Sequence, residues 1–166
     1  MGDPSEDWDH TIDVCNTISQ ARKHIVIITK HWNLIPDKLL NKIKRLKLCI
    51  NTSISALDND EQIHRRLHEF YRLKNYCNSV LRIVSCDFNK ENKEGICRSI
   101  IQDELFKHNK HIDTIFRPSN NNPLILNEII NTRKVKFLSS EVLASVFNKE
   151  TYFGTCKECP DMCGIL

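Results

Sequence analysis

Three cysteines crowd the C-terminal end of the 166-residue sequence with the spacing C-x2-C-x3-C: Cys156, Cys159 and Cys163. Thiolate sulfur is the ligand that zinc and iron–sulfur clusters favour in proteins. Gly154 and Gly164 flank the run and give its backbone the freedom to wrap a metal. The run therefore predicts an iron–sulfur cluster or, alternatively, zinc. A reduced tail without metal and a regulatory disulfide are the other interpretations.

A closed metal site also needs a fourth ligand. His10, Cys15 or Cys86 could supply it, and the sequence selects none of them. The five cysteines outside the tail lie singly inside apolar segments, where a small buried hydrophobic residue is the simpler interpretation.

Polar side chains follow the apolar segments, at the point where each segment ends. Parallel strands end at one edge of a sheet, and open α/β sheets and β/α barrels bind their ligands there. We therefore expect a ligand site formed by Gly2, Asp3, Thr29, Lys30, Ser53, Ser55, Asn89 and Arg117, together with His31, Asp58, Ser85, Asp87 and Ser119. Alternatively, some of these residues only cap helices and turns; Asp58 in particular is expected to cap the next helix with Glu61.

Arg82 differs from this set because it lies inside the apolar segment 80–84. A charged group at such a place must pair with an opposite charge or face a ligand in a barrel interior. Both interpretations of Arg82 stay open.

Five apolar segments predict strands at residues 25–28, 48–55, 80–84, 112–116 and 135–138. Helical patterns occupy residues 9–22, 36–46, 60–74, 93–108, 124–132 and 139–147. The alternation predicts a parallel sheet with right-handed crossovers. The helix at 60–74 is expected to direct Arg65, Arg66, Glu69 and Lys74 largely outward. The helix at 93–108 is expected to bury Ile96, Ile100, Ile101 and Leu105.

Composition and charge predict one soluble domain with a full core. The net charge of +3 is spread along the chain, so nucleic acid is not indicated as a partner. The N-terminus does not resemble a signal peptide, and no apolar run is long enough to span a membrane. We expect a cytoplasmic protein with reduced thiols.

The order of these segments resembles the radical S-adenosylmethionine enzymes, entered at their second strand. Gly2-Asp3-Pro4 resembles the motif that ends that strand, and Ser53-Ile54-Ser55-Ala56-Leu57-Asp58 resembles a serine-rich run that follows the fourth. The resemblance covers residues 1–140, through short motifs. It implies an α/β fold, a partial β/α barrel with parallel strands over residues 1–150, and a cysteine-rich metal-binding tail over residues 151–166.

The same resemblance implies that S-adenosylmethionine binds at the strand ends, with Arg65 or Arg66 at its carboxylate and Arg82, Asn89 and Arg117 near its adenosine. The family's C-x3-C-x2-C loop does not occur in the sequence, and the C-terminal cysteines have the reverse spacing. An upstream segment or a partner chain would then complete the barrel, and self-association would cover an exposed sheet edge. The chain alone should not perform the radical reaction, and its substrate is not indicated.

Two further hypotheses come from other classes of protein. One is a non-catalytic α/β protein with a structural zinc or iron–sulfur site at its C-terminus. The other is an unrelated doubly wound α/β protein that binds a nucleotide at the same edge.

Overall fold

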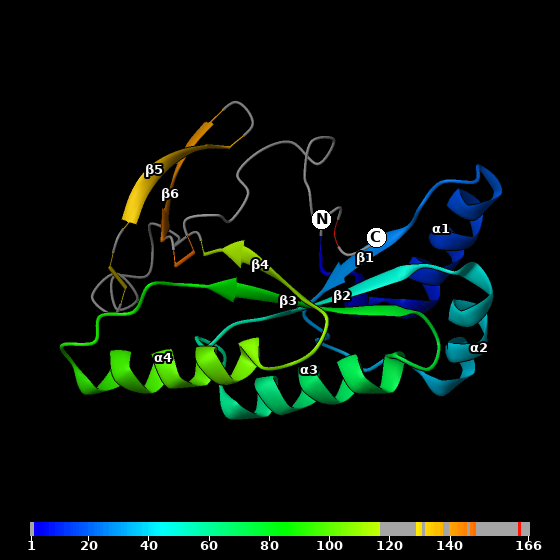
Figure 1. The fold of residues 1–166 in the computed structure, drawn as a ribbon. Coiled ribbons are helices and arrows are strands. Elements are labelled where there is room, and N and C mark those ends of the chain that lie inside the picture. Colours follow the sequence, from blue (N-terminus) through cyan, green and yellow to red (C-terminus); the bar gives the residue numbers. More distant parts are fainter. Residues whose placement is uncertain are drawn as a thin grey trace.

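The computed structural model describes residues 2–116, 129–130, 132–137, 140–145, 147–148 and 163. Its centre is a four-stranded, all-parallel sheet in the order β1 (Val26–Thr29), β2 (Cys49–Ile54), β3 (Asn78–Ser85) and β4 (His111–Ile115) (Figure 1). The helices are the short 3-10 helix η1 (Pro4–Glu6), α1 (Trp8–Gln20), α2 (Asp37–Leu46), α3 (Asp60–Leu73) and α4 (Lys93–Phe106). The predicted α/β fold with a parallel sheet is confirmed.

The sheet has two chemically different faces, because successive side chains of a strand point to opposite sides. One face carries Ile27, Ile50, Ile54, Leu81 and Ile83, which pack against the helices. Figure 1 shows α3 and α4 lying along this side of the sheet. We call the other side the open face; its residues include Ile28, Cys49, Asn51, Ser53, Val80, Arg82 and Thr114.

Helix α3 begins at Asp60, as expected, but a different residue caps it. Asn59 is its N-cap, accepting a hydrogen bond from Gln62 N (2.9 Å), and the Gln62 side chain accepts one from Asn59 N (3.1 Å). The expected capping pair of Asp58 and Glu61 is therefore wrong. Asp58 instead accepts the backbone N–H of Ser55 (2.8 Å), so it closes the turn that leaves β2.

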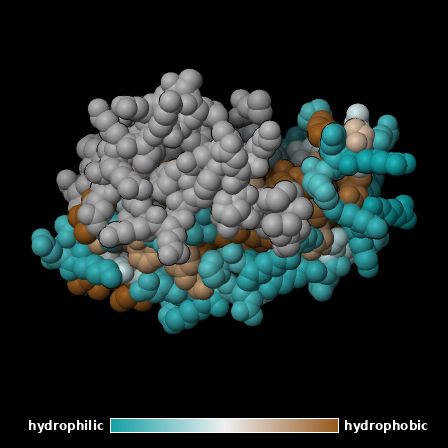
Figure 2. Space-filling model, turned by 45° about the horizontal axis from the view of Figure 1, so that its top comes forward, coloured by the Kyte–Doolittle hydropathy of each residue, from teal (hydrophilic) through white to brown (hydrophobic). Residues whose placement is uncertain are grey.

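Two expectations about helix faces are wrong in part. Lys74 is exposed as expected, but Arg66 and Glu69 are 1% and 0% exposed rather than outward. On α4, Leu105 is buried as expected, whereas Ile96 and Ile100 are 45% and 57% exposed. Figure 2 shows hydrophobic residues at the surface at its lower left, the side on which α4 lies in Figure 1. The sheet side of α4 instead carries Gly95, Ser99, Gln102 and Leu105, and the Gln102 amide exchanges two hydrogen bonds with the backbone of Cys86.

After β4, the chain does not continue the predicted alternation of helices and parallel strands. Strands β5 (Thr132–Phe137) and β6 (Ser140–Ser145) form an antiparallel pair in a separate two-stranded sheet. The expected helix at 139–147 is thus replaced by a strand, and Thr132 begins β5 rather than ending a helix. An apolar run this short fits the periodicity of a helix as well as that of a strand. Pairing with the neighbouring strand therefore decides which of the two it forms. Residues 117–128 and 131 lie outside the described part of the chain.

Candidate functional site

Arg82 lies on the open face near the middle of β3, opposite Ser53 on β2 and Ile112 on β4. Its guanidinium donates to Thr114 Oγ1 (3.3 Å) and to the Cys163 sulfur (3.8 Å). Within the described residues, no carboxylate pairs with it. Its hydrogen-bond partners within the described part of the chain are therefore a hydroxyl and a thiol.

Asn51 is a second polar group on this face, two residues before Ser53 on β2. It is fully buried, and its Nδ2 donates to the backbone oxygen of Cys163 (2.9 Å). Its Oδ1 has no hydrogen-bond partner among the described atoms. A buried acceptor without a donor costs about 1–3 kcal/mol, so a ligand or a water that donates to it would be stabilising. The sequence analysis missed Asn51, although an amide inside an apolar strand gives the same signal as Arg82.

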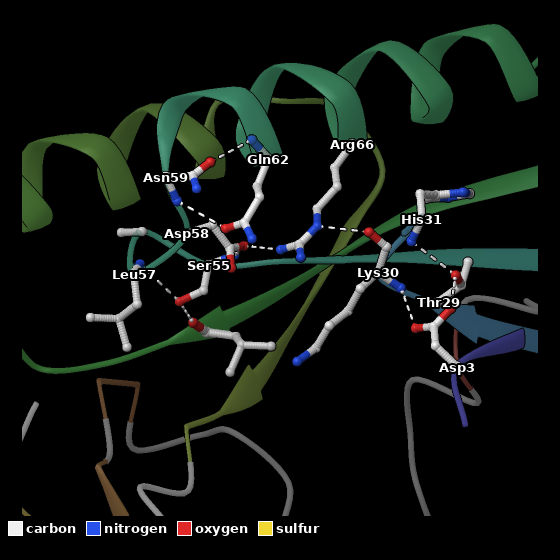
Figure 3. A network of polar contacts seen from close by, with 12 residues as sticks. Asp3, Thr29, Lys30, His31, Ser55, Leu57, Asp58, Asn59, Gln62 and Arg66 are labelled. Carbon is white, nitrogen blue, oxygen red and sulfur yellow. Dashed lines mark hydrogen bonds and ion pairs between the residues drawn. The ribbon is translucent and has the colours of Figure 1, made fainter. Parts of the chain in front are cut away.

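Asp3 and Thr29 meet at the carboxyl end of β1, as the sequence predicted (Figure 3). Asp3 Oδ1 accepts from Thr29 Oγ1 (2.6 Å) and from Ser5 N and Oγ, and Oδ2 accepts from Lys30 N (2.8 Å). Burial raises the pKa of Asp3, but these hydrogen bonds outweigh burial and lower it below its usual value. The carboxylate therefore anchors the segment before α1 to the end of β1.

Arg66 connects the ends of β1 and β2 from above (Figure 3). Its Nε donates to the Lys30 carbonyl (2.8 Å), and its Nη1 forms an ion pair with Asp58. Its Nη2 is buried without a partner among the described atoms. Arg65, in contrast, is 27% exposed and pairs with the exposed Glu61 at 3.9 Å, while its Nε is buried without a partner among the described atoms. Of the two arginines that the resemblance implied, Arg66 is the one at the strand ends.

The cationic groups at this edge share one aromatic ring. The Lys30 ammonium lies 5.7 Å and the Arg66 guanidinium 5.4 Å from the centre of the Trp32 ring. Trp32 is 41% exposed, so this ring and the Lys30 side chain are open to a ligand that approaches the end of β1. Ser55 contributes differently, since its hydroxyl donates to the Val84 carbonyl (3.0 Å) and ties β2 to β3.

The residues that follow β3 do not join this group. Asn89 Oδ1 accepts the N–H of Glu91 (3.0 Å) and closes a turn. The backbone of Asp87 is bonded to the Ser145 hydroxyl and to Ile130 N, which fix the start of the loop. Gly2 is placed beside η1, where a Cβ atom would lie 2.0 Å from Glu6 Oε2. Arg117 lies outside the described residues.

Cys163 is the one member of the C-terminal cysteine run within the described residues. It lies over the open face, where its backbone oxygen accepts from Asn51 and from the Cys49 thiol (3.5 Å). Burial raises the pKa of Cys49, and the nearby Cys163 thiol raises it further. Among the described residues, no three acidic, histidine or cysteine side chains are grouped to hold a metal.

The proposed fourth ligands stand in different surroundings. Cys15 is packed in the core between α1 and α2, His10 is exposed, and Cys86 is buried beside the loop after β3. Burial raises the pKa of the Cys86 thiol far above its usual range. None of the three has a recorded contact with Cys163, whose neighbours are on β2 and β3.

Within the described residues, the helices are all too short or too polar to cross a bilayer. No protein-family model matches the chain. The curated proteins and the solved structures likewise yield no match.

Proposed function

We propose that this chain is the S-adenosylmethionine-binding part of a radical S-adenosylmethionine-type enzyme, built as a partial β/α barrel. The strand order β1-β2-β3-β4 supports this proposal, because sequential parallel strands with helices on one side are the repeating unit of such barrels. The open face would then be the barrel interior. A cytoplasmic location and an upstream segment or partner chain that completes the barrel belong to the same proposal.

The single observation that carries the proposal is the environment of Arg82. A guanidinium on a sheet face without a carboxylate among its described neighbours is suited to bind an anionic group. S-adenosylmethionine carries a carboxylate, an amino group and ribose hydroxyls. The Ser53 hydroxyl and the unpaired Asn51 Oδ1 lie on the same face as Arg82 and match the neutral polar groups of that cofactor.

The chain's own residues would have distinct tasks. Arg82 would hold the carboxylate, Ser53 and Asn51 would orient hydroxyl or amino groups, and Lys30 with Trp32 would close the end of β1. When bound next to a reduced iron–sulfur cluster, S-adenosylmethionine supplies a radical that abstracts hydrogen from a substrate. The reducing cluster would be supplied by the upstream segment or partner chain, and the spacing of Cys156, Cys159 and Cys163 suggests only an additional, auxiliary cluster.

Isothermal titration calorimetry with S-adenosylmethionine tests the proposal. The unmodified chain should bind it saturably, and Arg82→Gln should bind about 10- to 100-fold more weakly, since a hydrogen bond to a charged group contributes roughly 1.5–3 kcal/mol. Arg65→Gln is the matched control and should leave the affinity unchanged, because the ion pair of Arg65 is with Glu61 of α3 and not with a residue of the open face.

No saturable binding up to millimolar cofactor, or equal affinities for Arg82→Gln and the unmodified chain, would refute the assignment. Tighter binding of ATP than of S-adenosylmethionine would instead favour the doubly wound nucleotide-binding hypothesis. Circular dichroism of each variant shows whether the sheet and helices are retained.

A second candidate is a non-catalytic α/β protein whose C-terminus holds a structural iron–sulfur cluster or zinc. The contact of Cys163 with Asn51 and Cys49 supports it, because it holds one cysteine of the run against the sheet. Iron, sulfide and zinc should be measured after anaerobic preparation, in the unmodified chain and in a Cys156, Cys159 and Cys163 triple alanine variant. Exposed Cys97→Ala is the control.

Iron and sulfide that disappear in the triple variant would establish a cluster and favour the radical-enzyme proposal. One equivalent of zinc that disappears in it would favour the structural site. Neither metal in the unmodified chain would eliminate both assignments of the tail.

A further inference from the structure

The amino edge of the parallel sheet, where its strands begin, gathers basic residues. Helices α1, α2, α3 and α4 each lead into the start of the next strand, so all of them end at this edge. The exposed basic residues of their last turns and of the turns that follow are Arg22, Lys23, His24, Lys44, Arg45, Lys47, Lys74, Lys107, Lys110 and His111. We call this set the basic rim.

The start of each strand is fixed beside the start of its neighbour, so the basic rim forms a row. Cys49 N donates to Ile25 O (2.9 Å), which places the turn before β2 next to the turn before β1. The register of β2 with β3 begins with Cys49 opposite Asn78, and Leu81 N of β3 donates to Lys110 O (3.1 Å). Neighbouring strands lie about 4.8 Å apart, so the row extends for about 14 Å across the sheet.

The acidic residues in the helix ends and turns that form the basic rim are Asp103 and Glu104, and Glu104 pairs with Lys107. The lysines and arginines of the rim outnumber these carboxylates by more than the net charge of +3, so the rest of the chain is net negative. The charge looks evenly spread along the sequence, and folding collects it at one edge. Figure 2 shows long hydrophilic side chains at its right end, where α1 and α2 lie in Figure 1.

Helix C-termini favour basic residues by themselves, because the helix dipole places partial negative charge there. This effect accounts for Lys44 and Arg45, which lie in the last turn of α2. It does not account for Lys23, Lys110 and His111, which lie beyond the ends of α1 and α4. The basic rim therefore holds more positive charge than its helix ends require.

An exposed aromatic ring lies within the basic rim. Tyr71 of α3 is 46% exposed, and the Lys74 ammonium lies 4.5 Å from the centre of its ring. The Tyr71 hydroxyl is hydrogen-bonded to His108 Nδ1, which comes from the turn after α4. Proteins that bind single-stranded nucleic acid combine these two features, because cations bind the phosphates and an aromatic ring stacks on a base.

We propose that the basic rim binds single-stranded nucleic acid, with phosphates along the cations and a base on Tyr71. A duplex keeps its bases stacked inside and would leave Tyr71 without a base. The proposal does not depend on the cofactor, because the rim lies at the opposite edge of the sheet from Asp3 and Ser55.

Fluorescence anisotropy with labelled single-stranded RNA and DNA of about 12 nucleotides, at several salt concentrations, tests this proposal. Lys44→Gln with Arg45→Gln removes charge from the rim, and Tyr71→Leu removes the ring. Lys38→Gln with Lys90→Gln is the matched control, because both lysines are exposed and lie near the other edge, at the start of α2 and after β3.

The unmodified chain should bind at least one of the two oligonucleotides saturably at low salt. The rim variant should bind about tenfold or more weakly, and the slope of log affinity against log salt should become shallower by about 1.4, the value for two phosphate contacts on a single strand. Tyr71→Leu should weaken binding by about tenfold with the salt slope unchanged, because it removes stacking and no charge. The control variant should match the unmodified chain.

A second pair, Lys23→Gln with Lys110→Gln, tests the two ends of the row and should weaken binding like the first pair. Circular dichroism of each variant shows whether the fold is retained.

The absence of saturable binding at low salt would overturn the proposal, as would equal losses in the rim and control variants. Unchanged affinity of Tyr71→Leu, or a duplex of the same length bound as tightly, would overturn the assignment to single strands. Tighter binding to phosphatidylserine vesicles than to the oligonucleotides would assign the rim to a membrane surface instead.

Discussion

Replacing Arg66 by methionine is the most informative single change, because it separates two adjacent arginines of α3 that look alike in the sequence. Arg66 is 1% exposed, and its guanidinium contacts the Lys30 carbonyl and the Asp58 carboxylate. Methionine keeps the length, the apolar stem and the helix propensity of the side chain. The substitution therefore removes mainly the charge and its hydrogen bonds.

The expected loss of stability follows from the burial of the pair. Removing one partner of a buried ion pair costs about 3–5 kcal/mol, because the other charge is left uncompensated. The Asp58 side chain is 18% exposed and keeps the Ser55 N–H, so water and this hydrogen bond offset part of the cost. We expect Arg66→Met to lower the free energy of unfolding by about 2–3 kcal/mol. Arg65→Met should lower it by at most about 1 kcal/mol, because Arg65 is half-buried but its ion pair with the exposed Glu61 is long.

Urea unfolding followed by circular dichroism and tryptophan fluorescence measures both variants. The double variant of Arg66→Met with Asp58→Asn should be less destabilised than the sum of the single variants, by about 1 kcal/mol or more, because the two residues interact directly. Equal losses for the two arginine variants, or strict additivity in the double variant, would refute the assignment of Arg66 as the buried connection between β1 and β2.

Two further predictions concern pH and backbone packing. His31 is fully buried, and burial lowers its pKa to about 4 despite the opposing effect of nearby Glu69 and Asp3. Between pH 6.5 and about 4 the unfolded chain binds a proton that the folded chain does not, so the free energy of unfolding should fall as pH falls in this window. His31→Asn, which tolerates the backbone φ of 49°, should flatten that dependence in urea titrations at several pH values; an unchanged slope would contradict it. Gly95→Ala should destabilise by about 2 kcal/mol or more, because its Cβ would lie 1.7 Å from the backbone oxygen of Asn89. Gly2→Ala, whose Cβ would meet only the flexible end of Glu6, is the control in the same thermal unfolding experiment.

The parallel sheet was predictable because its strands are short, β-branched and regularly separated by helical patterns. The predicted strand at 48–55 contains β2, whose six residues are all buried. The predictions failed at β6, where a six-residue segment fits a helical or an extended period equally well. Pairing with β5, which the local pattern cannot encode, decides its conformation.

The buried charges of α3 show why periodicity alone misassigns a helix face. A charged residue is normally expected to face solvent, so Arg66 and Glu69 were predicted outward. Both are buried because they bind the loop after β1: Arg66 holds the Lys30 carbonyl, and Glu69 Oε2 accepts Ile35 N (3.2 Å). Each also has a charged partner nearby, Asp58 for Arg66 and Arg72 for Glu69, but their backbone partners are far away in the sequence, and no pattern within α3 indicates those.

The candidate site was predictable where a residue type conflicted with its surroundings. Arg82 was identified for that reason. Asp3, Thr29, Lys30 and Asn89 were selected instead for their place after a strand; the structure brings the first three together, whereas Asn89 closes a local turn. A position at the end of a strand is therefore a weaker signal than a polar group inside one.

The burial of the open face bears directly on the proposed ligand. A polar face that simply met water would have exposed residues, whereas Asn51 is 0% and Ser53 9% exposed. Buried polar groups must be compensated by hydrogen bonds, and Asn51 Oδ1 lacks one among the described atoms. A ligand that donates to Asn51 and accepts from Arg82 would remove this cost. Asn51→Leu should therefore weaken ligand binding while changing the stability of the unliganded chain much less, because it removes an acceptor that has no donor among the described atoms.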